Sequence, residues 1–219
     1  RQFLNQFYTG QFEGSFARGV PFNYNPITKD MRISGTTASL CGLESALGDA
    51  ELTQEAVARI LLMHGIILAC EWIPLIYLGD EMATLNDYTY EKDPHQANDS
   101  RWVHRPPHNQ DRFIEAQNGD QAPAQVYRGL QTLIHARKQL DAVVTEGERT
   151  EFKWAGNVHV LNMSRGHHFT LLTNFSENPQ TIEWPADMRP ARDTISGMTV
   201  TDKTHITLAG LQQMWLIKQ

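Results

Sequence analysis

The sequence is poor in the features that define disulfide-rich, nucleic-acid-binding and membrane-spanning proteins. Its 219 residues include only two cysteines, Cys41 and Cys70, which predicts buried thiols in place of a disulfide scaffold. The 19 basic residues are outnumbered by 25 acidic ones, and the net charge of −6 gives no reason to expect nucleic acid or an anionic membrane as a partner. The longest apolar run, residues 60–70, is too short to cross a bilayer.

The sequence also lacks a signal-peptide-like start and the motifs of metal or nucleotide sites. Residues 1–20 have no apolar core of the signal-peptide type. Because the chain begins with Arg1, we expect a fragment, and its cellular location, cytoplasmic or secreted, stays open. There is no glycine-rich phosphate loop, and prolines interrupt the cluster of histidines in the long loop, so we expect no metal and no cofactor. These histidines are His95, His104 and His108.

What the sequence does contain, before its last third, is a series of helix-like and strand-like patterns. Apolar residues at helical spacing predict a helix over residues 53–72 that is buried on several sides. The short apolar run at residues 74–78 predicts a parallel strand covered on both faces. Residues 82–120 show no periodicity and are expected to form a long functional loop. Residues 123–140 are predicted to form a second helix.

After Gly147 the pattern changes to period two, which is typical of antiparallel strands. The predicted strands are residues 158–161, 169–172, 180–184, 205–208 and 214–217. They predict a small β-sandwich with a boundary near residues 143–147. The preceding order of elements suits the closing end of a (β/α)8 barrel, but about 140 residues are too few for a whole one. The predicted fold is therefore α/β plus all-β: the C-terminal part of a (β/α)8 TIM barrel, followed by an antiparallel β-sandwich domain.

Five segments resemble amylosucrases, the glucansucrases of the α-amylase superfamily. They are residues 1–5 (RQFLN) with 12–22 (FEGSFARGVPF), 30–36 (DMRISGT), 74–81 (PLIYLGDE) with 84–87 (TLND), 98–106 (NDSRWVHRP) and 213–216 (QMWL). The resemblance covers nearly the whole chain in order. The GDE segment occurs across the superfamily, whereas the FARGVPF and NDSRW segments are much more specific.

The resemblance implies three regions. Residues 1–48 correspond to most of the insertion that follows the seventh barrel strand. Residues 49–142 correspond to the end of the catalytic barrel, with its seventh helix, eighth strand, long eighth loop and eighth helix. Residues 143–219 correspond to the C-terminal antiparallel β domain. Residues 44–52 and 70–73 depart from the family pattern, and they affect packing before the eighth strand more than chemistry.

The chemistry is expected to come from elsewhere in the enzyme. Retaining glycosyl transfer needs a nucleophilic carboxylate and a carboxylic acid about 5 Å apart. In this superfamily both lie on middle barrel strands, and a third aspartate follows the seventh strand, so the resemblance places all three before Arg1. Asp80 and Glu81 are adjacent at a strand end and point to opposite sides, so they cannot face one sugar as a pair. We therefore expect no catalytic residue here and a structural role for both.

Three arginines match substrate-binding residues of amylosucrases. Arg101 matches one that pairs with an acidic residue from an early loop and closes the pocket around the glucosyl ring of the donor, a role that suits the bidentate fork of arginine. Arg32 matches one that contacts the fructosyl side of sucrose, and Arg1 matches one among the acceptor subsites. The alternatives are surface ion pairs, of Arg101 with Asp99 or Asp87 and of Arg32 with Asp30.

The resemblance implies that the whole enzyme cleaves sucrose and transfers glucose to an α-1,4-glucan with retention, so sucrose and an α-glucan acceptor are the expected partners. A sucrose hydrolase, or another glycosidase of the superfamily, is an alternative. A non-enzyme alternative is a glucan-binding β module over residues 147–219. It would use Trp154, Trp184 or Trp215, although tryptophans in strand patterns are more often packed in a core.

Overall fold

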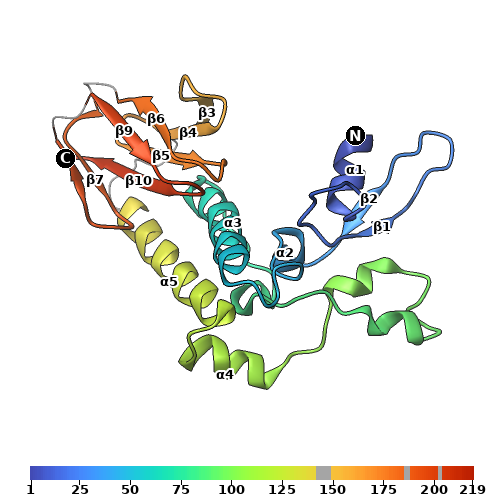
Figure 1. Ribbon diagram of the computed structural model, residues 1–219. Helices are drawn as coiled ribbons and strands as arrows, with labels where there is room; N and C mark the ends of the chain where they lie inside the picture. Colours follow the sequence, from blue (N-terminus) through green and yellow to red (C-terminus); the bar gives the residue numbers. More distant parts are fainter. Residues whose placement is uncertain (142–148, 185–187, 202–203) are drawn as a thin grey trace. The chain divides into compact units, whose positions relative to one another are not determined.

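The computed structural model describes residues 1–141, 149–184, 188–201 and 204–219, which form two compact units (Figure 1). One unit comprises residues 1–60 and 76–127, and the other comprises residues 61–75 and 128–219. The long helices α3 (Ala50–Ala69) and α5 (Ala122–Asp141) each contribute residues to both units. The domain boundary that the sequence predicts near residues 143–147 lies outside the described residues.

Helices α3 and α5 confirm the two predicted helices, but α3 is less buried than its composition indicates. Ile60 and Leu68 are buried, whereas Met63 and Ile67 are each 45% exposed, so one side of the helix is open. By length and composition α3 could cross a membrane, a property that it shares with the core helices of soluble proteins. The absence of a membrane partner therefore stays a prediction.

Within the second unit, α3 and α5 pack closely. A Cβ atom on Gly129 of α5 would lie 2.5 Å from the methyl groups of Leu61 in α3, so the helices approach at a position that has no side chain. Arg137 of α5 caps the end of α3. Its Nη1 donates to the carbonyl oxygen of Cys70 at 2.8 Å, and its Nη2 donates to that of Trp72 at 3.2 Å. These bonds satisfy carbonyl groups at and just beyond the helix end, where no helical partner is available.

The predicted strand at residues 74–78 is wrong in this structure. The segment has no regular secondary structure and pairs with no strand among the described residues. Its backbone N–H groups at positions 75–78 make no hydrogen bond with the described residues. Leu75 and Leu78 are 74% and 76% exposed. The reason is physical: a parallel strand exists only through hydrogen bonds to neighbouring strands, and the described residues supply none.

The first unit is built from short elements. They are α1 (Gln2–Tyr8), β1 (Val20–Phe22), β2 (Arg32–Ser34), α2 (Thr37–Leu40), the 3-10 helices η1 (Asp80–Met82), η2 (Tyr88–Lys92) and η3 (Ser100–His104), and α4 (Gln110–Asn118). The sequence did not predict α4, because the helix has nine residues and buries only Ala116. Asn109 marks its start, since its Oδ1 accepts the N–H of Arg112 at 2.9 Å.

The second unit contains the predicted antiparallel β domain. Its strands are β3 (Thr150–Trp154), β4 (Val160–Arg165), β5 (Phe169–Asn174), β6 (Gln180–Glu183), β7 (Ala191–Asp193), β8 (Thr199–Val200), β9 (His205–Leu208) and β10 (Gln213–Lys218). One sheet has the order β3-β4-β5-β10-β7-β8, and β6 pairs with β9 in a second. The five predicted strands are confirmed as β4, β5, β6, β9 and β10. The others were missed because β3 is an exposed edge strand and β7 and β8 are very short.

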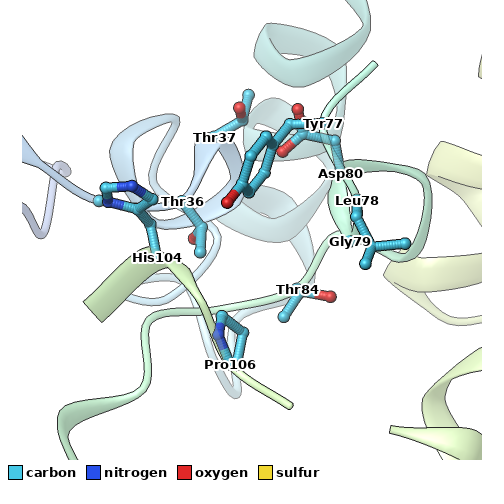
Figure 2. Close-up of a pocket in the computed structure, with 10 residues that line it drawn as sticks. Thr36, Thr37, Tyr77, Leu78, Gly79, Asp80, Thr84, His104 and Pro106 are labelled. Atoms are coloured by element: carbon cyan, nitrogen blue, oxygen red, sulfur yellow. The ribbon is translucent and has the colours of Figure 1, made fainter. Parts of the chain in front are cut away.

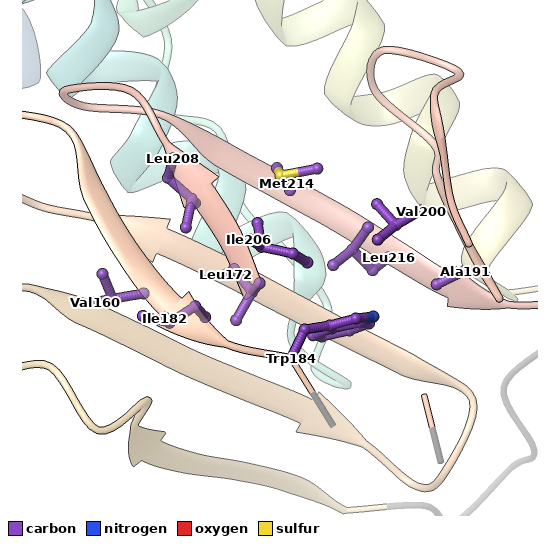
Figure 3. Close-up of a cluster of buried hydrophobic side chains, with 10 residues drawn as sticks. All are labelled: Val160, Leu172, Ile182, Trp184, Ala191, Val200, Ile206, Leu208, Met214 and Leu216. Carbon is purple, nitrogen blue, oxygen red and sulfur yellow. The ribbon is translucent and has the colours of Figure 1, made fainter. Parts of the chain in front are cut away.

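One hydrophobic core joins the two sheets (Figure 3). Leu172 of β5 and Leu216 of β10 come from the six-stranded sheet, and Ile182 of β6 and Leu208 of β9 come from the two-stranded sheet. All four side chains are buried. The second unit therefore has an apolar core of its own, contributed by strands that are far apart in the sequence.

The three tryptophans of the β domain differ in environment. Trp184 and Trp215 are 2% and 0% exposed, which confirms the core packing expected for them. The indole Nε1 of Trp215 donates to Oε1 of Gln213 at 3.1 Å, so its polar atom is satisfied. Trp154 lies on the edge strand β3 and is 59% exposed. Of the three, Trp154 alone presents its ring at the surface.

We expect Leu172→Ala to lower the free energy of unfolding of the β domain by about 2–5 kcal/mol, because it removes a fully buried side chain and leaves a cavity. Val158→Ala is the control: Val158 is exposed, and its replacement should change the free energy by less than about 0.5 kcal/mol. Urea unfolding followed by tryptophan fluorescence measures both. Equal effects of the two substitutions would contradict this assignment of the core.

Candidate functional site

Arg32 and Arg101 each neighbour Phe22 in the ribbon formed by β1 and β2. Phe22 of β1 is paired with Arg32 of β2 across the ladder, so the two side chains lie on the same face of the ribbon. Helix η3, which carries Arg101, is fastened to the ribbon because Oγ of Ser100 donates to the carbonyl oxygen of Pro21 at 2.8 Å. Two arginines that are 69 positions apart in the sequence are thereby brought to one place.

The guanidinium group of Arg101 has two close neighbours. Its Nε lies 2.8 Å from Oδ1 of Asp99 and its Nη2 lies 2.7 Å from Oδ2, which makes a bidentate ion pair. Its Cζ lies 4.9 Å from the centroid of the Phe22 ring, within the range of a cation–π contact. The pairing with Asp99 that the sequence left open is therefore formed. The side chain is still 48% exposed, and its Nη1 makes no hydrogen bond with the described residues.

Asp99 is held in place by the backbone as well as by Arg101. It is the N-cap of η3, because its Oδ1 accepts the backbone N–H of Arg101 at 3.0 Å. The side-chain hydrogen bonds of Arg101, followed by this backbone bond, lower the pKa of Asp99 to about 2, and the pair raises the pKa of Arg101. The carboxylate is therefore ionised throughout the neutral and mildly acidic range.

Arg32 and Arg1 have different surroundings. The side chain of Arg32 is exposed and makes no ion pair or hydrogen bond with the described residues. Asp30, the partner considered for Arg32, accepts from Nη1 of Arg1 at 2.6 Å and from Nδ2 of Asn5 at 3.2 Å. The hydrogen bond from Asn5 and then that from Arg1 lower the pKa of Asp30. Arg32 thus keeps its whole guanidinium group available.

Arg1 borders a separate shallow hollow of about 270 Å³. The hollow is lined by Arg1, Gln2, Asn5, Thr28, Lys29 and Asp30. The Arg1 side chain is 86% exposed, so its ion pair with Asp30 is a surface pair that contributes little to stability. Of the three predicted substrate-binding arginines, the structure brings Arg101 and Arg32 together, whereas Arg1 lies beside Asp30, two positions before Arg32.

Asn86 is a residue whose role the sequence did not reveal, although it stands in the matched segment TLND. Its Oδ1 accepts the N–H of Thr36 at 2.8 Å, and its backbone N–H donates to Oγ of Ser39 at 2.9 Å. Its Nδ2 donates to the carbonyl oxygen of Arg18 and to the hydroxyl of Tyr88. The signal that could have found it is chemical, since a side chain that links two segments through their backbones needs both a donor and an acceptor.

A second hollow, of about 180 Å³, adjoins η3 (Figure 2). The rings of Tyr77 and His104 line it, with centroids 6.2 Å apart and planes at 70°. Burial, followed by the charges of Arg105 and Arg101, lowers the pKa of His104, so the imidazole is neutral at pH 7. Asp80 is the one carboxylate in the lining. This hollow therefore offers hydrogen-bonding groups but lacks the carboxylate pair of a retaining glycosidase.

In the part of the chain that the structure describes, no group of three or more His, Cys, Asp or Glu side chains could hold a metal ion. Glu81 anchors its own turn, because its Oε2 accepts the N–H of Gly79 at 2.8 Å. Cys41 and Cys70 are free thiols. Burial raises the pKa of Cys41 to about 12, which makes it a poor nucleophile. The chemistry that this arrangement supports is binding, through arginine and aromatic side chains.

No family model matches the chain. Solved structures have a related fold at low identity. The trehalulose synthase MutB in complex with isomaltulose is 17% identical, with a TM-score of 0.55, and the match covers 74% of this chain and 38% of MutB. AmyP in complex with maltotriose is 13% identical, with a TM-score of 0.55, over 84% of this chain and 38% of AmyP.

The type III pullulan hydrolase from Thermococcus kodakarensis is 17% identical, with a TM-score of 0.52, over 75% of this chain and 24% of that enzyme. The chain therefore has the fold of part of these carbohydrate-active enzymes, which is consistent with a partial TIM barrel plus a β domain. It spans well under half the length of the structures that it matches.

We expect the Asp99 carboxyl to titrate near pH 2 and Arg101→Ala to raise its pKa toward 3.8, because the substitution removes the side-chain hydrogen bonds. The backbone N–H of residue 101 should retain part of the lowering. Since the folded pKa lies below the ordinary one, the stabilising effect of the pair is present above about pH 3.8 and is lost as the pH falls through about 2. NMR titration of the carboxyl carbons measures this. An Asp99 pKa that does not respond to the substitution would show that the pair does not form in solution.

Proposed function

We propose that this chain is part of an enzyme of the α-amylase superfamily that acts on carbohydrates. The fold supports the proposal, because structures similar to the chain include a trehalulose synthase in complex with isomaltulose and a pullulan hydrolase. One part of such an enzyme could contribute arginine and aromatic side chains that bind the substrate, while another part supplies the catalytic carboxylates.

Within that superfamily we propose an amylosucrase-like activity: cleavage of sucrose and transfer of glucose to an α-1,4-glucan with retention. The observation that carries the proposal is that Arg101 and Arg32 both lie beside Phe22. Both arginines keep N–H groups available, Arg101 through Nη1 and Arg32 through its whole guanidinium. Two such groups at one site can bind the two halves of a disaccharide through its hydroxyl oxygens.

The division of labour follows from the chemistry of retention. A carboxylate attacks C1 of the glucosyl ring while a carboxylic acid protonates the leaving fructose, which gives a glucosyl-enzyme. A glucan hydroxyl then attacks C1 and gives its proton to the second carboxylate, so the first carboxylate is released. We assign none of these steps to this chain. Arg101 would hold the glucosyl side and Arg32 the fructosyl side of the donor, and Arg1 would contact the acceptor.

Sucrose hydrolase is the alternative activity, because the same groups would recognise the same donor and water would replace the glucan. Incubation of the full-length protein with sucrose separates the two. Glucan chains among the products support transfer, whereas glucose and fructose alone support hydrolysis. Failure to cleave sucrose, with cleavage of another α-glucoside, would leave the superfamily proposal in place and remove the sucrose assignment.

We expect Arg101→Lys in the full-length protein to lower sucrose turnover by about ten- to a hundredfold, because lysine keeps the charge but loses the planar fork and a charged hydrogen bond. Arg192→Lys, at an exposed position on β7, is the control and should leave turnover unchanged. Initial rates of fructose release measure both. Wild-type kinetics in Arg101→Lys would assign Arg101 a structural role.

We expect Arg32→Ala to weaken the use of sucrose more than the use of an aryl α-glucoside, because Arg32 is proposed to lie on the leaving-group side. A donor without fructose makes no contact with Arg32, so its kcat/KM should change little. The ratio of kcat/KM for the two donors is the measurement. Equal losses with both donors would indicate general damage to the ribbon that carries Arg32.

A second candidate function is glucan binding by the β domain, and the exposure of Trp154 favours it. Trp154 and Phe152 lie on one face of the edge strand β3, and both rings are about half exposed. Exposed aromatic faces suit stacking on sugar rings. We expect glucan to retard the chain in affinity electrophoresis and Trp154→Ala to abolish the retardation. Migration of the wild-type chain unchanged by glucan would end this idea.

A further inference from the structure

We propose that Asp99 is a positioning residue, which holds the Arg101 guanidinium ready for the substrate. The inference deepens the proposed function and rests on it for the identity of the substrate. Asp99 acts through Arg101 and touches no substrate itself, so it differs from the three arginines in kind.

Asp99 occupies one edge of the Arg101 guanidinium and leaves the other accessible. A guanidinium has two sides that can bind in a bidentate manner, one formed by Nε with an Nη atom and one formed by the two Nη atoms. Asp99 takes the first, with Nε···Oδ1 of 2.8 Å and Nη2···Oδ2 of 2.7 Å. The second side, which includes Nη1, has no partner on Nη1 among the described residues. The pairing with Asp99 therefore orients the guanidinium and leaves its Nη1 available to a ligand.

The Asp99 carboxylate is itself held by a further hydrogen bond. Oδ1 of Asp99 also accepts the backbone N–H of Arg101 at 3.0 Å, so the chain from residue 99 to residue 101 closes on itself. The Phe22 ring lies 4.9 Å from Cζ and covers one face of the guanidinium. One edge and one face are thus fixed. An arginine that is restrained before binding loses less side-chain freedom when the ligand arrives.

A neighbouring 3-10 helix shows that capping alone does not require the ion pair. Asp87 caps η2 in the same way, since its Oδ1 accepts the N–H of Thr89 at 2.8 Å, and it makes no ion pair with an arginine of the described residues. The bonds from Asp99 to the side chain of Arg101 are therefore an addition to the cap. Because asparagine is also a good N-cap, Asp→Asn replacement retains the cap through Oδ1, removes the charge and puts an NH2 donor in place of the second acceptor oxygen.

The test is a double-mutant cycle in the full-length protein with sucrose. Asp99→Asn should lower kcat/KM by about two- to tenfold, as expected when one rotamer-rich side chain loses its restraint. In an Arg101→Ala background the same replacement should cause no further loss, because Asp99 acts only through Arg101. Asp87→Asn, which keeps its cap, should leave kcat/KM unchanged. Equal effects of Asp99→Asn with and without Arg101, or equal effects at positions 99 and 87, would overturn the proposal.

A second measurement keeps this inference separate from the proposed function. In residues 1–219, NMR should show the Arg101 Nε–H exchanging with water more slowly than that of Arg32, and Asp99→Ala, which removes both acceptor oxygens, should remove the difference. An Arg101 Nε–H that exchanges as fast as that of Arg32 in the wild-type chain would refute the positioning role, whatever the enzyme does. A slow Arg101 Nε–H in a protein that does not use sucrose would refute the substrate assignment alone.

Discussion

The hydrogen bonds of Asn86 are the constraint on which the candidate site depends. They join the segment that carries β1 and β2 to the loop that carries η3, because Asn86 bonds to Thr36, Ser39 and Arg18. One side-chain amide suits this link because it offers an acceptor and two donors within the space of a single residue. The ribbon then supplies Arg32 and Phe22, and η3 supplies Arg101. The segments that carry these side chains are thus held in a defined arrangement. A binding site that is built on loops needs such support, because its side chains must keep fixed positions.

The rest of the molecule divides into a part that is complete in itself and a part that is not. The β domain has its own core, which Leu172 and Ile182 join across two sheets. The segment at residues 74–78 is the opposite case, since its apolar side chains are exposed and its backbone has no strand partner among the described residues. The exposure of Leu75 and Leu78 is costly in water because it leaves apolar surface hydrated, and an unpaired strand edge can pair with another strand. The simplest physical account is that further parallel strands of a longer protein cover it.

Much of the fold could be predicted from the sequence, because α3, α5 and five strands carry clear periodicity over a sufficient length. The failures have separate causes. Residues 74–78 have the composition of a strand, but composition does not show whether a neighbouring strand exists. Helix α4 and strand β3 bury too little for a periodic signal. For the site, the arginines came from the resemblance, whereas the stacking on Phe22 and the link through Asn86 depend on tertiary contacts that no local pattern contains.

We propose that this chain forms part of a barrel whose neighbouring strands are not among the described residues. Amide hydrogen exchange at Leu75, Ile76, Tyr77 and Leu78 tests it most directly, in monomeric residues 1–219 and in the full-length protein. In residues 1–219 we expect these four amides to exchange at close to the rate of an unfolded chain, while the amides of β5 and β10 remain protected. In the full-length protein we expect the same four amides to exchange slowly. Protection of these amides in the monomeric chain, or their rapid exchange in the full-length protein, would contradict it.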